Sequence, residues 1–545
     1  MSNNTKDWDL YEKGKKFCNT IEPNYFSTVE TNLDFFAGNQ WRNVKSNGMP
    51  TPVFNIIKRS LTFFVSSITS QKVKVNYETL ESREDDADEG QYMDISKIAT
   101  SEVANLFEKF KMDNRIRDAL FDAGTMGDVA AHMYFDYNSK PYGGAFNDVQ
   151  GEIQFELVDG TNVFFGNPNN PSTSTNVQPY IIISGRDSVE NLKREAMENM
   201  KGNQTEVEGI ETDKPSDDMA GQYGQVEIEG DKFGKATYII IYKYDRESKT
   251  IKASKCTKSA YMFKDVDTGL SIYPISWLVW ERQKNLYHGR ALATGMIPNQ
   301  IFINRMFAMV MYHLMMSAFP KAVYDRNRIS SWNNEIGVAI PVDAMGGENI
   351  KNIAGYLEPG NMSGQIVQVI DLAIQHTKES LGINDAMLGN INPESASGKS
   401  IVATVQQSQM PLENQKANLF EFIEEIGKIL LDMMGTYYGA RPILMNTPDG
   451  RQVIDYDFAV LKNIFLNCKT DVGASSYWSE IASVETLDNL FNNGHLDIID
   501  YLESMPDGYI PKKNELIGKI KEKMAMQPPI PVDAMPPMGA MPPKM

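Results

Sequence analysis

The first part of the chain has apolar residues at intervals of three and four, which is the pattern of amphipathic helices. This pattern predicts helices over residues 54–69 and 95–121. Between them, residues 81–89 form an acidic run, which we interpret as a solvated surface segment. From Asp128 the pattern changes to short runs of β-branched and aromatic residues separated by Gly, Asn and Pro, which is typical of strands. Strands are predicted over residues 129–136, 153–158, 179–184 and 237–244.

Two amphipathic helices that enclose a small β-rich module follow in the middle of the chain. The helices are predicted over residues 297–317 and 365–381, and the module over residues 319–358. Each helix has an apolar stripe along one face, which needs a packing partner. The stripes consist of Ile303, Phe307, Val310 and Leu314 in the first helix, and of Ile366, Val369, Ile370, Ala373 and Ile374 in the second.

A loop and a long helix come next. Residues 382–397 are predicted to be a loop from their Gly, Asn, Pro and Ser content. Residues 399–438 are predicted to be a helix with a kink at Pro411, because proline removes a backbone hydrogen bond and clashes with the preceding turn. The remaining predictions are strands within residues 441–470, a helical region over 477–524 and an extended or disordered Pro- and Met-rich tail from 527. The predicted fold class is α+β.

The charge balance argues against a protein that holds DNA tightly. The chain has 545 residues, with 71 acidic and 53 basic side chains and a formal charge of −18. A protein that binds DNA through its phosphates normally has a basic face. The length predicts three or four compact units, and a hydrophobic fraction of 42% indicates a folded protein. This composition is compatible with a protein that contacts DNA without binding it tightly.

The chain has no pattern that indicates a metal, a cofactor, a disulfide framework or a membrane span. Its three cysteines lie far apart with no CxxC pair, which favours a reducing compartment. They are Cys18, Cys256 and Cys468. The most apolar long window, residues 301–319, contains groups that a transmembrane helix rarely carries in mid-span. These groups are Asn304, Arg305 and His313. We therefore expect a soluble protein that is not exported by itself.

No catalytic residues are predicted. Residues 397–400 read Ser-Gly-Lys-Ser, like the end of a phosphate-binding P-loop, but Pro393 stands where that motif needs its first glycine. The segment is therefore interpreted as a helix start. The five histidines are scattered singly, and no family-like arrangement of nucleophile and base is present. The sequence predicts a protein that is not an enzyme.

Four stretches of the sequence, in this order, resemble the portal proteins of tailed bacteriophages. The resemblance covers about residues 35–520. The stretches are Gln40-Trp41 with residues 50–57; residues 123–128 with 156–166; residues 288–290 with 298–305; and residues 393–398. The resemblance implies a portal fold with an α/β wing, a two-helix stem, a small β-rich clip, a long kinked helix and a helical crown. The implied parts are the wing over 1–288 and 398–475, the stem over 289–317 and 362–382, the clip over 318–361, a tunnel loop over 383–397, the crown over 476–524 and a disordered tail over 525–545.

The resemblance implies a ring, usually of twelve subunits, at one vertex of the virion capsid. Double-stranded DNA would pass through the ring during packaging and ejection. The implied partners are the terminase large subunit, a head–tail adaptor, and the major capsid and scaffolding proteins, with assembly in the host cytoplasm. ATP hydrolysis would belong to the docked terminase. An acidic bore would repel phosphates and let DNA slide.

The resemblance also implies three groups of site residues. The DNA-channel group is Asn384, Asp385, Asn390, Asn392, Glu394, Ser395 and Lys399; the partner-docking group in the clip is Lys321, Arg326, Arg328 and Lys351; and the ring-interface group in the stem is Phe307, Val310, Leu314, Ile366 and Ile370. The alternatives are that the loop is only a surface connector and that the clip cations are isolated surface charges.

Two other functions stay open on the sequence. One is a packaging ATPase or nuclease, which would need a complete P-loop and acidic metal ligands. The other is a different virion structural protein, such as a scaffold or a tail component. That class is not expected to insert a β module between two helices.

Overall fold

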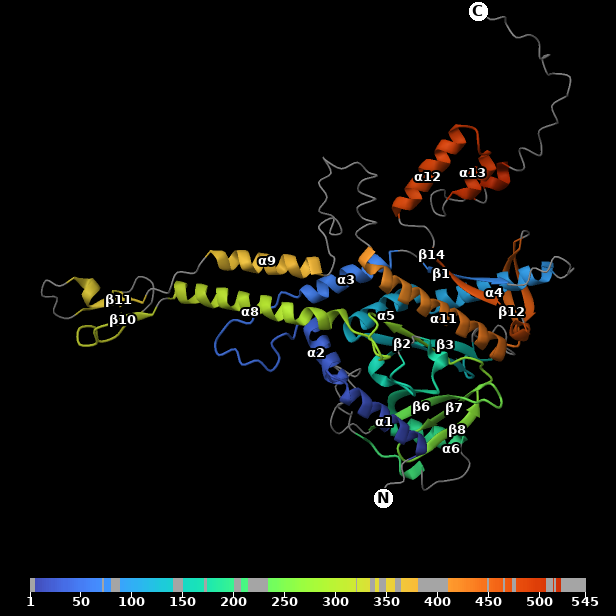
Figure 1. The fold of residues 1–545 in the computed structure, drawn as a ribbon, viewed down its shortest axis with the longest axis horizontal. Helices are drawn as coiled ribbons and strands as arrows, with labels where there is room; N and C mark the ends of the chain where they lie inside the picture. The colour runs from blue at the N-terminus through green and yellow to red at the C-terminus, as the bar shows by residue number, and fades with distance from the viewer. Residues whose placement is uncertain are drawn as a thin grey trace, which may run out of the picture. The chain divides into compact units, whose positions relative to one another are not determined.

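The computed structural model has runs of helices and runs of antiparallel strands that follow one another along the chain, so the predicted α+β class is confirmed (Figure 1). The structure describes residues 5–70, 73–79, 89–140, 150–170, 174–199, 207–213, 234–319, 321–333, 339–342, 349–357, 364–380, 410–447, 450–463, 466–472, 477–505, 513 and 516–520. The chain divides into two compact units. One comprises residues 1–69 and 74–471, and the other residues 70–73 and 472–545.

The first unit begins with helices that surround its sheets. They are α1 (Lys6–Thr20), α2 (Tyr25–Ala37), α3 (Ile56–Ile68), α4 (Glu89–Lys109) and α5 (Met112–Met126). The helix predicted over 54–69 is confirmed as α3, which begins where the Asn55 side chain accepts a hydrogen bond from the Lys58 N–H. The single helix predicted over 95–121 is wrong, because Lys111 has φ of 54° and separates α4 from α5. The acidic run at 81–88 lies outside the described residues.

Two antiparallel sheets form the centre of this unit. One has the strand order β3-β2-β9, and the other the order β4-β5-β6-β7-β8. Their bounds are β2 (Asp128–Asp136), β3 (Glu152–Asp159), β4 (Val163–Phe165), β5 (Tyr180–Ser188), β6 (Lys235–Tyr244), β7 (Ile251–Cys256), β8 (Tyr261–Asp267) and β9 (Ile275–Val279), with helix α6 (Val189–Asn199) after β5. The four predicted strands are confirmed as β2, β3, β5 and β6.

One hydrophobic core lies between the larger sheet and the N-terminal helices. Alternate residues of β6, Ile239 and Ile241, pack in one cluster with Trp8 and Tyr11 of α1 and Val29 of α2. Neither α1 nor α2 is predicted from the pattern, because α1 has few apolar residues among its charged ones. Their burial therefore depends on a sheet that comes more than a hundred residues later in the chain.

An arm projects from the sheets (Figure 1). We define the arm as residues 292–380, with α8 (Leu292–Ala318) and α9 (Gln365–Ser380) side by side and the ribbon of β10 (Ala322–Tyr324) and β11 (Ala354–Tyr356) at its tip. A 3₁₀ turn at Ile350–Asn352 precedes β11. The two predicted helices are confirmed, although α8 begins five residues before the predicted start. The described strands of the predicted β-rich module are only the two of this short ribbon.

The last part of the first unit is α11 (Glu413–Tyr437), the hairpin of β12 (Ala440–Thr447) and β13 (Gly450–Asp457), the 3₁₀ helix Phe458–Asn463, and β14 (Leu466–Val472), which pairs with β1 (Val73–Thr79). Pro411 lies in a 3₁₀ turn directly before α11, and a kink at this position stays a prediction on the described residues. The earlier part of the predicted helix lies outside them. The second unit contains α12 (Tyr477–Asn492) and α13 (Ile498–Ser504), and the predicted tail is also outside the described residues.

Candidate functional site

Two buried amides in the first half of α8 fix the arm to the body. The Oε1 of Gln300 accepts a hydrogen bond from the Ile56 N–H at 3.0 Å, and its Nε2 donates to the Phe54 carbonyl at 2.6 Å. One turn later, the Nδ2 of Asn304 donates to Oε1 of Gln40 at 2.5 Å. Gln300 and Asn304 are each 2% exposed. The motifs at 40–57 and 298–305 therefore meet in space, and their polar groups pair with each other.

A buried carboxylate holds the segment that leads into α8. Asp128, at the start of β2, accepts hydrogen bonds from Tyr25 Oη at 2.7 Å, the Gly289 N–H at 2.9 Å and His288 Nδ1 at 3.0 Å. A Cβ on Gly160 would lie 1.6 Å from its Oδ1, so only glycine fits there. We call this group the Asp128 junction. It joins the motifs at 123–128, 156–166 and 288–290, which are far apart in the sequence.

The Asp128 junction is an ion pair at neutral pH. Burial opposes the charged imidazole, but the adjacent carboxylate outweighs it and raises the pKa of His288 to about 9. Rings cover both faces of the imidazole, with Tyr25 at 3.7 Å and Tyr287 at 3.9 Å between centroids. A buried ion pair is tolerated when hydrogen bonds satisfy both charges, as they do here.

Cys18, His288 and Asp128 also lie in the order of a nucleophile, a base and an acid. The Sγ of Cys18 is 3.4 Å from His288 Nε2, on the side opposite Asp128. Each of the three side chains is at most 2% exposed. Because Cys18 is only 1% exposed, no substrate atom can reach its sulfur. The arrangement connects α1 to the junction, and we assign it a structural role.

The predicted ring-interface residues fall in different environments. Ile370 is 4% exposed within the single chain, so it belongs to the packing of α9 against α8. Its burial is therefore no evidence for a contact between subunits. Phe307 is half-buried, with its ring centroid 4.2 Å from that of Phe54. Val310 and Ile366 are half-buried. Leu314 is 56% exposed, so the apolar stripe of α8 turns away from α9 near its end.

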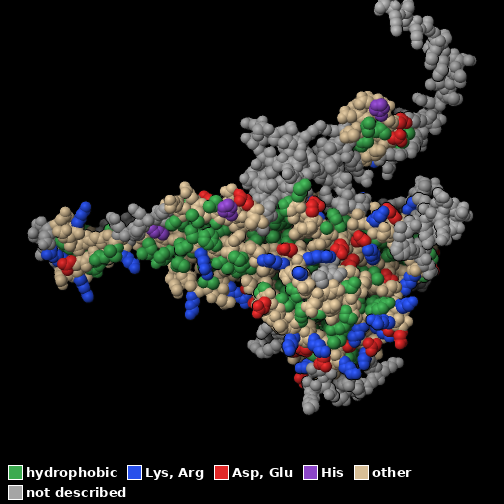
Figure 2. Space-filling model, in the orientation of Figure 1, with side chains coloured by type: hydrophobic (Ala, Val, Ile, Leu, Met, Phe, Trp, Pro, Cys, Tyr) green, Lys and Arg blue, Asp and Glu red, His purple; other side chains and the backbone are tan. Residues whose placement is uncertain are grey.

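Large apolar side chains remain exposed along the arm. Figure 2 shows them as a continuous apolar area over α8 and α9. They are Phe302, Met309, Met311, Tyr312, Leu314 and Met315 on α8, and Val367, Val369 and Leu372 on α9. Residues seven apart share one side of a helix, so Phe302 and Met309 lie on one flank of the arm. Met311 and Met315 lie on the other flank.

By length and composition alone, α8 could cross a membrane, and 17% of its most apolar window is buried in the chain. The two amide contacts fix its first half to the body. The part beyond Asn304 is about 21 Å long at ~1.5 Å per residue. This length is less than the ~30 Å hydrocarbon core of a bilayer. The exposed half of α8 is therefore better suited to protein partners.

The tip of the arm carries an aromatic cluster and the predicted docking cations. Trp332 lies between Tyr324 and Tyr356, at 5.6 Å and 5.8 Å between ring centroids. The cations Lys321, Arg326 and Lys351 are exposed, and Arg328 is 3.8 Å from Asp325. In the sequence, residues 319–363 have four basic and five acidic residues, so the tip has no excess of positive charge.

The predicted DNA-channel residues Asn384 to Lys399 lie outside the described residues, as does the Ser-Gly-Lys-Ser segment. Among the described residues, no cluster of His, Cys, Asp and Glu could hold a metal ion. The described cysteines are all free.

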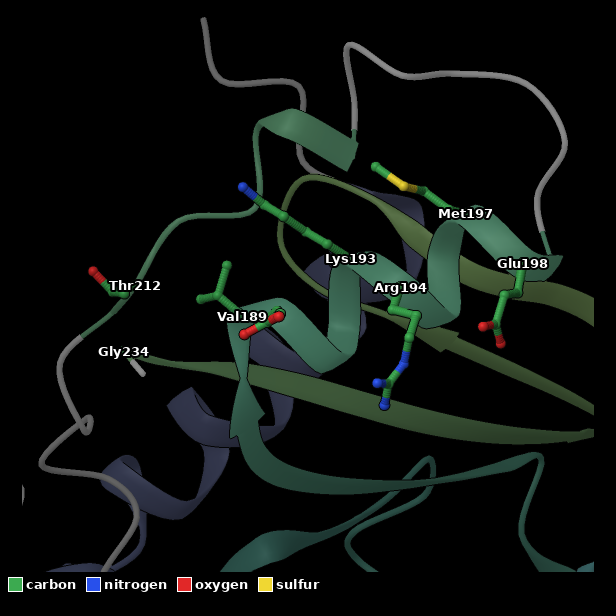
Figure 3. Close-up of a pocket in the computed structure, with 8 residues that line it drawn as sticks. Val189, Lys193, Arg194, Met197, Glu198, Thr212 and Gly234 are labelled. Carbon is green, nitrogen blue, oxygen red and sulfur yellow. The ribbon is translucent and has the colours of Figure 1, made fainter. Parts of the chain in front are cut away.

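A cavity of about 670 Å³ lies beside α6. Its lining includes Lys193, Arg194 and Glu198 of α6 and Gly234 before β6. Figure 3 shows that the charged side chains point in different directions and do not converge on one point. The cavity therefore offers no arrangement for acid–base chemistry.

A second cavity, of about 410 Å³, lies between α3, α8 and α9, and we call it the α3–α8–α9 cavity. Phe54, Phe63, Phe307 and Ile374 line it, with two cations, Arg59 and Lys378. The sequence pattern did not indicate this cavity, because its walls come from three distant segments.

One comparison with known proteins gives a match. A family model described as phage P22-like portal protein matches residues 191–449, which include the whole arm and α11. The search of curated proteins found no match.

We expect the stability of the protein to fall between about pH 6.5 and pH 9 through His288. The folded-state pKa of about 9 is above the usual value of about 6.5, so the stabilisation is complete below pH 6.5 and is lost as the pH rises through 9. The effect is on the order of 3 kcal/mol. Urea unfolding of wild type and His288→Gln at several pH values measures it.

The wild-type advantage over His288→Gln should be large at pH 6.5 and small at pH 9. Burial also raises the pKa of Asp122 and of Glu425 to about 7, which acts in the same direction. Both carboxyls are present in both proteins, so their effect cancels in the comparison. Parallel stability curves would show that the Asp128 junction is not an ion pair.

Proposed function

Because this chain belongs to a phage portal protein family, we propose that it is the subunit of a ring through which double-stranded DNA enters and leaves the capsid. The proteins of this family are structural components of the virion and not enzymes. The ring would stand at one vertex of the capsid and form the channel for packaging and ejection. Twelve subunits are the number that the family resemblance suggests.

The observation that carries this proposal is the exposed apolar surface on both flanks of the arm. A helix that is fully packed within its own chain shows an apolar stripe on one side only. In a ring, each subunit contacts two neighbours through two different surfaces. Phe302 and Met309 on one flank and Met311 and Met315 on the other would then be covered. Burying one such side chain contributes about 1.5–3 kcal/mol.

We assign the parts of the portal fold to the described elements as follows. The stem is α8 with α9, and the clip is the tip with β10 and β11. The wing comprises the helices and sheets before α8 together with α11 and the strands after it. The crown comprises α12 and α13. The tunnel loop at 383–397 lies between α9 and α11 in the sequence and would face the bore.

The channel would conduct DNA without holding it. Each chain has a formal charge of −18, so a ring has many negative charges around the path of the DNA. A basic lining would release counterions from DNA and produce strong, salt-dependent adhesion. We propose that brief contacts come from the tunnel-loop residues Asn384, Asn390, Asn392 and Ser395 and from Lys399. Asp385 and Glu394 would keep these contacts short by repulsion.

The tip would be the docking surface for the terminase large subunit and later for the head–tail adaptor. Tyr and Trp residues often provide most of the binding energy of protein interfaces, and Trp332 and Tyr356 are available for this role. Lys321, Arg326, Arg328 and Lys351 would form polar contacts around them. The major capsid and scaffolding proteins would contact the wing.

Replacing exposed apolar residues of the arm by aspartate should abolish the ring and leave the subunit folded. Leu314→Asp and Val369→Asp are suitable, because both side chains are exposed in the single chain, at 56% and 43%. In the ring, an unpaired buried charge would cost several kcal/mol per subunit. Light scattering and negative-stain imaging measure assembly, and the thermal midpoint of the subunit measures folding.

Met197→Asp is the matched control, because Met197 is 55% exposed but lies on α6, away from the arm. This variant should assemble like wild type. Rings of normal mass from both arm variants would contradict the proposed interface.

Deleting residues 388–392 should leave rings intact and impair the packaging or retention of DNA. The reason is that the proposed contacts with DNA come from this loop, whereas the ring contacts come from the arm. Packaging assays with full-length genomes measure the effect. If rings with the deletion package and hold genomes as well as wild type, the tunnel loop has no role in contacting DNA.

A further inference from the structure

We infer that Phe302 and Met309 of one subunit fill the α3–α8–α9 cavity of the neighbouring subunit. This inference rests on the proposed ring, in which this contact would join each subunit to the next. The partner is a second copy of this chain, because both halves of the contact are present on each copy. They lie on opposite flanks of the same arm.

The cavity is an apolar recess with a basic end. Phe307 and Ile374 face it from α8 and α9, and Phe54 and Phe63 complete its apolar walls. Phe54 remains 45% exposed, although its ring centroid lies 4.2 Å from that of Phe307. At about 410 Å³, the cavity has room for large side chains. An apolar recess of this kind is most stable when an apolar group displaces its water.

Phe302 and Met309 form the complementary ridge. They are 46% and 51% exposed, although each is a large apolar side chain. Seven residues make two turns, so both lie on one flank of α8. Phe307 comes two residues before Met309, which is about 200° around the helix. The ridge and the cavity are therefore on opposite sides of α8, and one chain cannot fill its own cavity with this ridge.

The ridge and the cavity also lie at matching levels along the arm. At a rise of ~1.5 Å per residue, Met309 lies about 3 Å farther along the α8 axis than Phe307. Phe302 lies about 7.5 Å from Phe307 along the same axis, on the side of the body. On α9, which runs back toward the body, Lys378 follows Ile374 by one turn of about 6 Å. A ring relates its subunits by rotation about an axis. If the arm runs along that axis, residues at the same height on neighbouring subunits face each other. Met309 of one subunit is then at the height of Phe307 and Ile374 of the next, and Phe302 is at the height of Lys378.

The chemistry at each level is compatible. The thioether of Met309 would pack among aromatic and aliphatic side chains, where methionine adapts well to irregular space. The ring of Phe302 would lie near the ammonium of Lys378, which has no described ion pair, and a cation over an aromatic face is attracted to it. The heterologous contact then repeats around the ring until it closes.

Chemical cross-linking of a two-cysteine variant tests the contact. The variant Met309→Cys with Ile374→Cys is assembled and treated with a short bismaleimide. The three native cysteines are at most 2% exposed, so they should not react. The expected result on a denaturing gel is a ladder of covalent multimers up to the size of the closed ring.

The matched control is Met311→Cys with Ile374→Cys. Met311 is also exposed, at 40%, but it follows Phe307 by one turn and so shares the cavity flank. It should give no ladder. Light scattering of each variant before cross-linking shows whether rings are present.

Intact rings without a ladder from the 309–374 pair would overturn this contact and leave the ring standing. Equal ladders from both pairs would also overturn it, because the flanks would then not be distinguished. If wild-type protein forms no ring under any assembly condition, the proposed function fails and this contact fails with it.

Discussion

The arm depends on the anchoring of α8 by buried polar groups at its base. An unpaired carboxylate or amide in the protein interior costs several kcal/mol, so each must find partners in fixed positions. Asp128 finds three, and Gln300 and Asn304 bind the backbone at Phe54 and Ile56 and the side chain of Gln40. Apolar packing alone would tolerate small rotations of the helix. The hydrogen bonds fix its direction and its rotation, and with them the flanks that it presents to neighbours.

This constraint explains why the two halves of α8 differ. The first half uses its polar residues to pair with the body, as at Gln300 and Asn304. The second half has only apolar and small residues and a single imidazole after Arg305, and most of its large side chains remain exposed. A helix that is fixed at one end and apolar along the other presents its surface in a defined direction. Such a surface suits repeated contact with identical copies.

The sequence predicted the arm because its signals are local. The stripe of α9 repeats with the helical period, and the strands β2, β3, β5 and β6 are runs of β-branched and aromatic residues bounded by Gly, Asn and Pro. The base of the arm was not predictable in this way. Asp128, Cys18, Tyr25 and His288 are separated by up to 270 residues, and nothing in their local pattern shows that they meet. Ile370 shows the same limit, since periodicity identifies a buried face but not whether the partner is the same chain or another.

Charge gives a further reason for the arm to be the contact between subunits. Identical chains with a formal charge of −18 repel each other, and this repulsion grows as more copies gather. Residues 292–380 have six basic and seven acidic residues, a net charge of only −1, and α8 itself has Arg305 as its single charged residue. The acidic residues are therefore concentrated in the rest of the chain. Copies that meet along the arm gain apolar burial where the like-charge repulsion between them is smallest, and the acidic surface stays in water or along the path of the DNA.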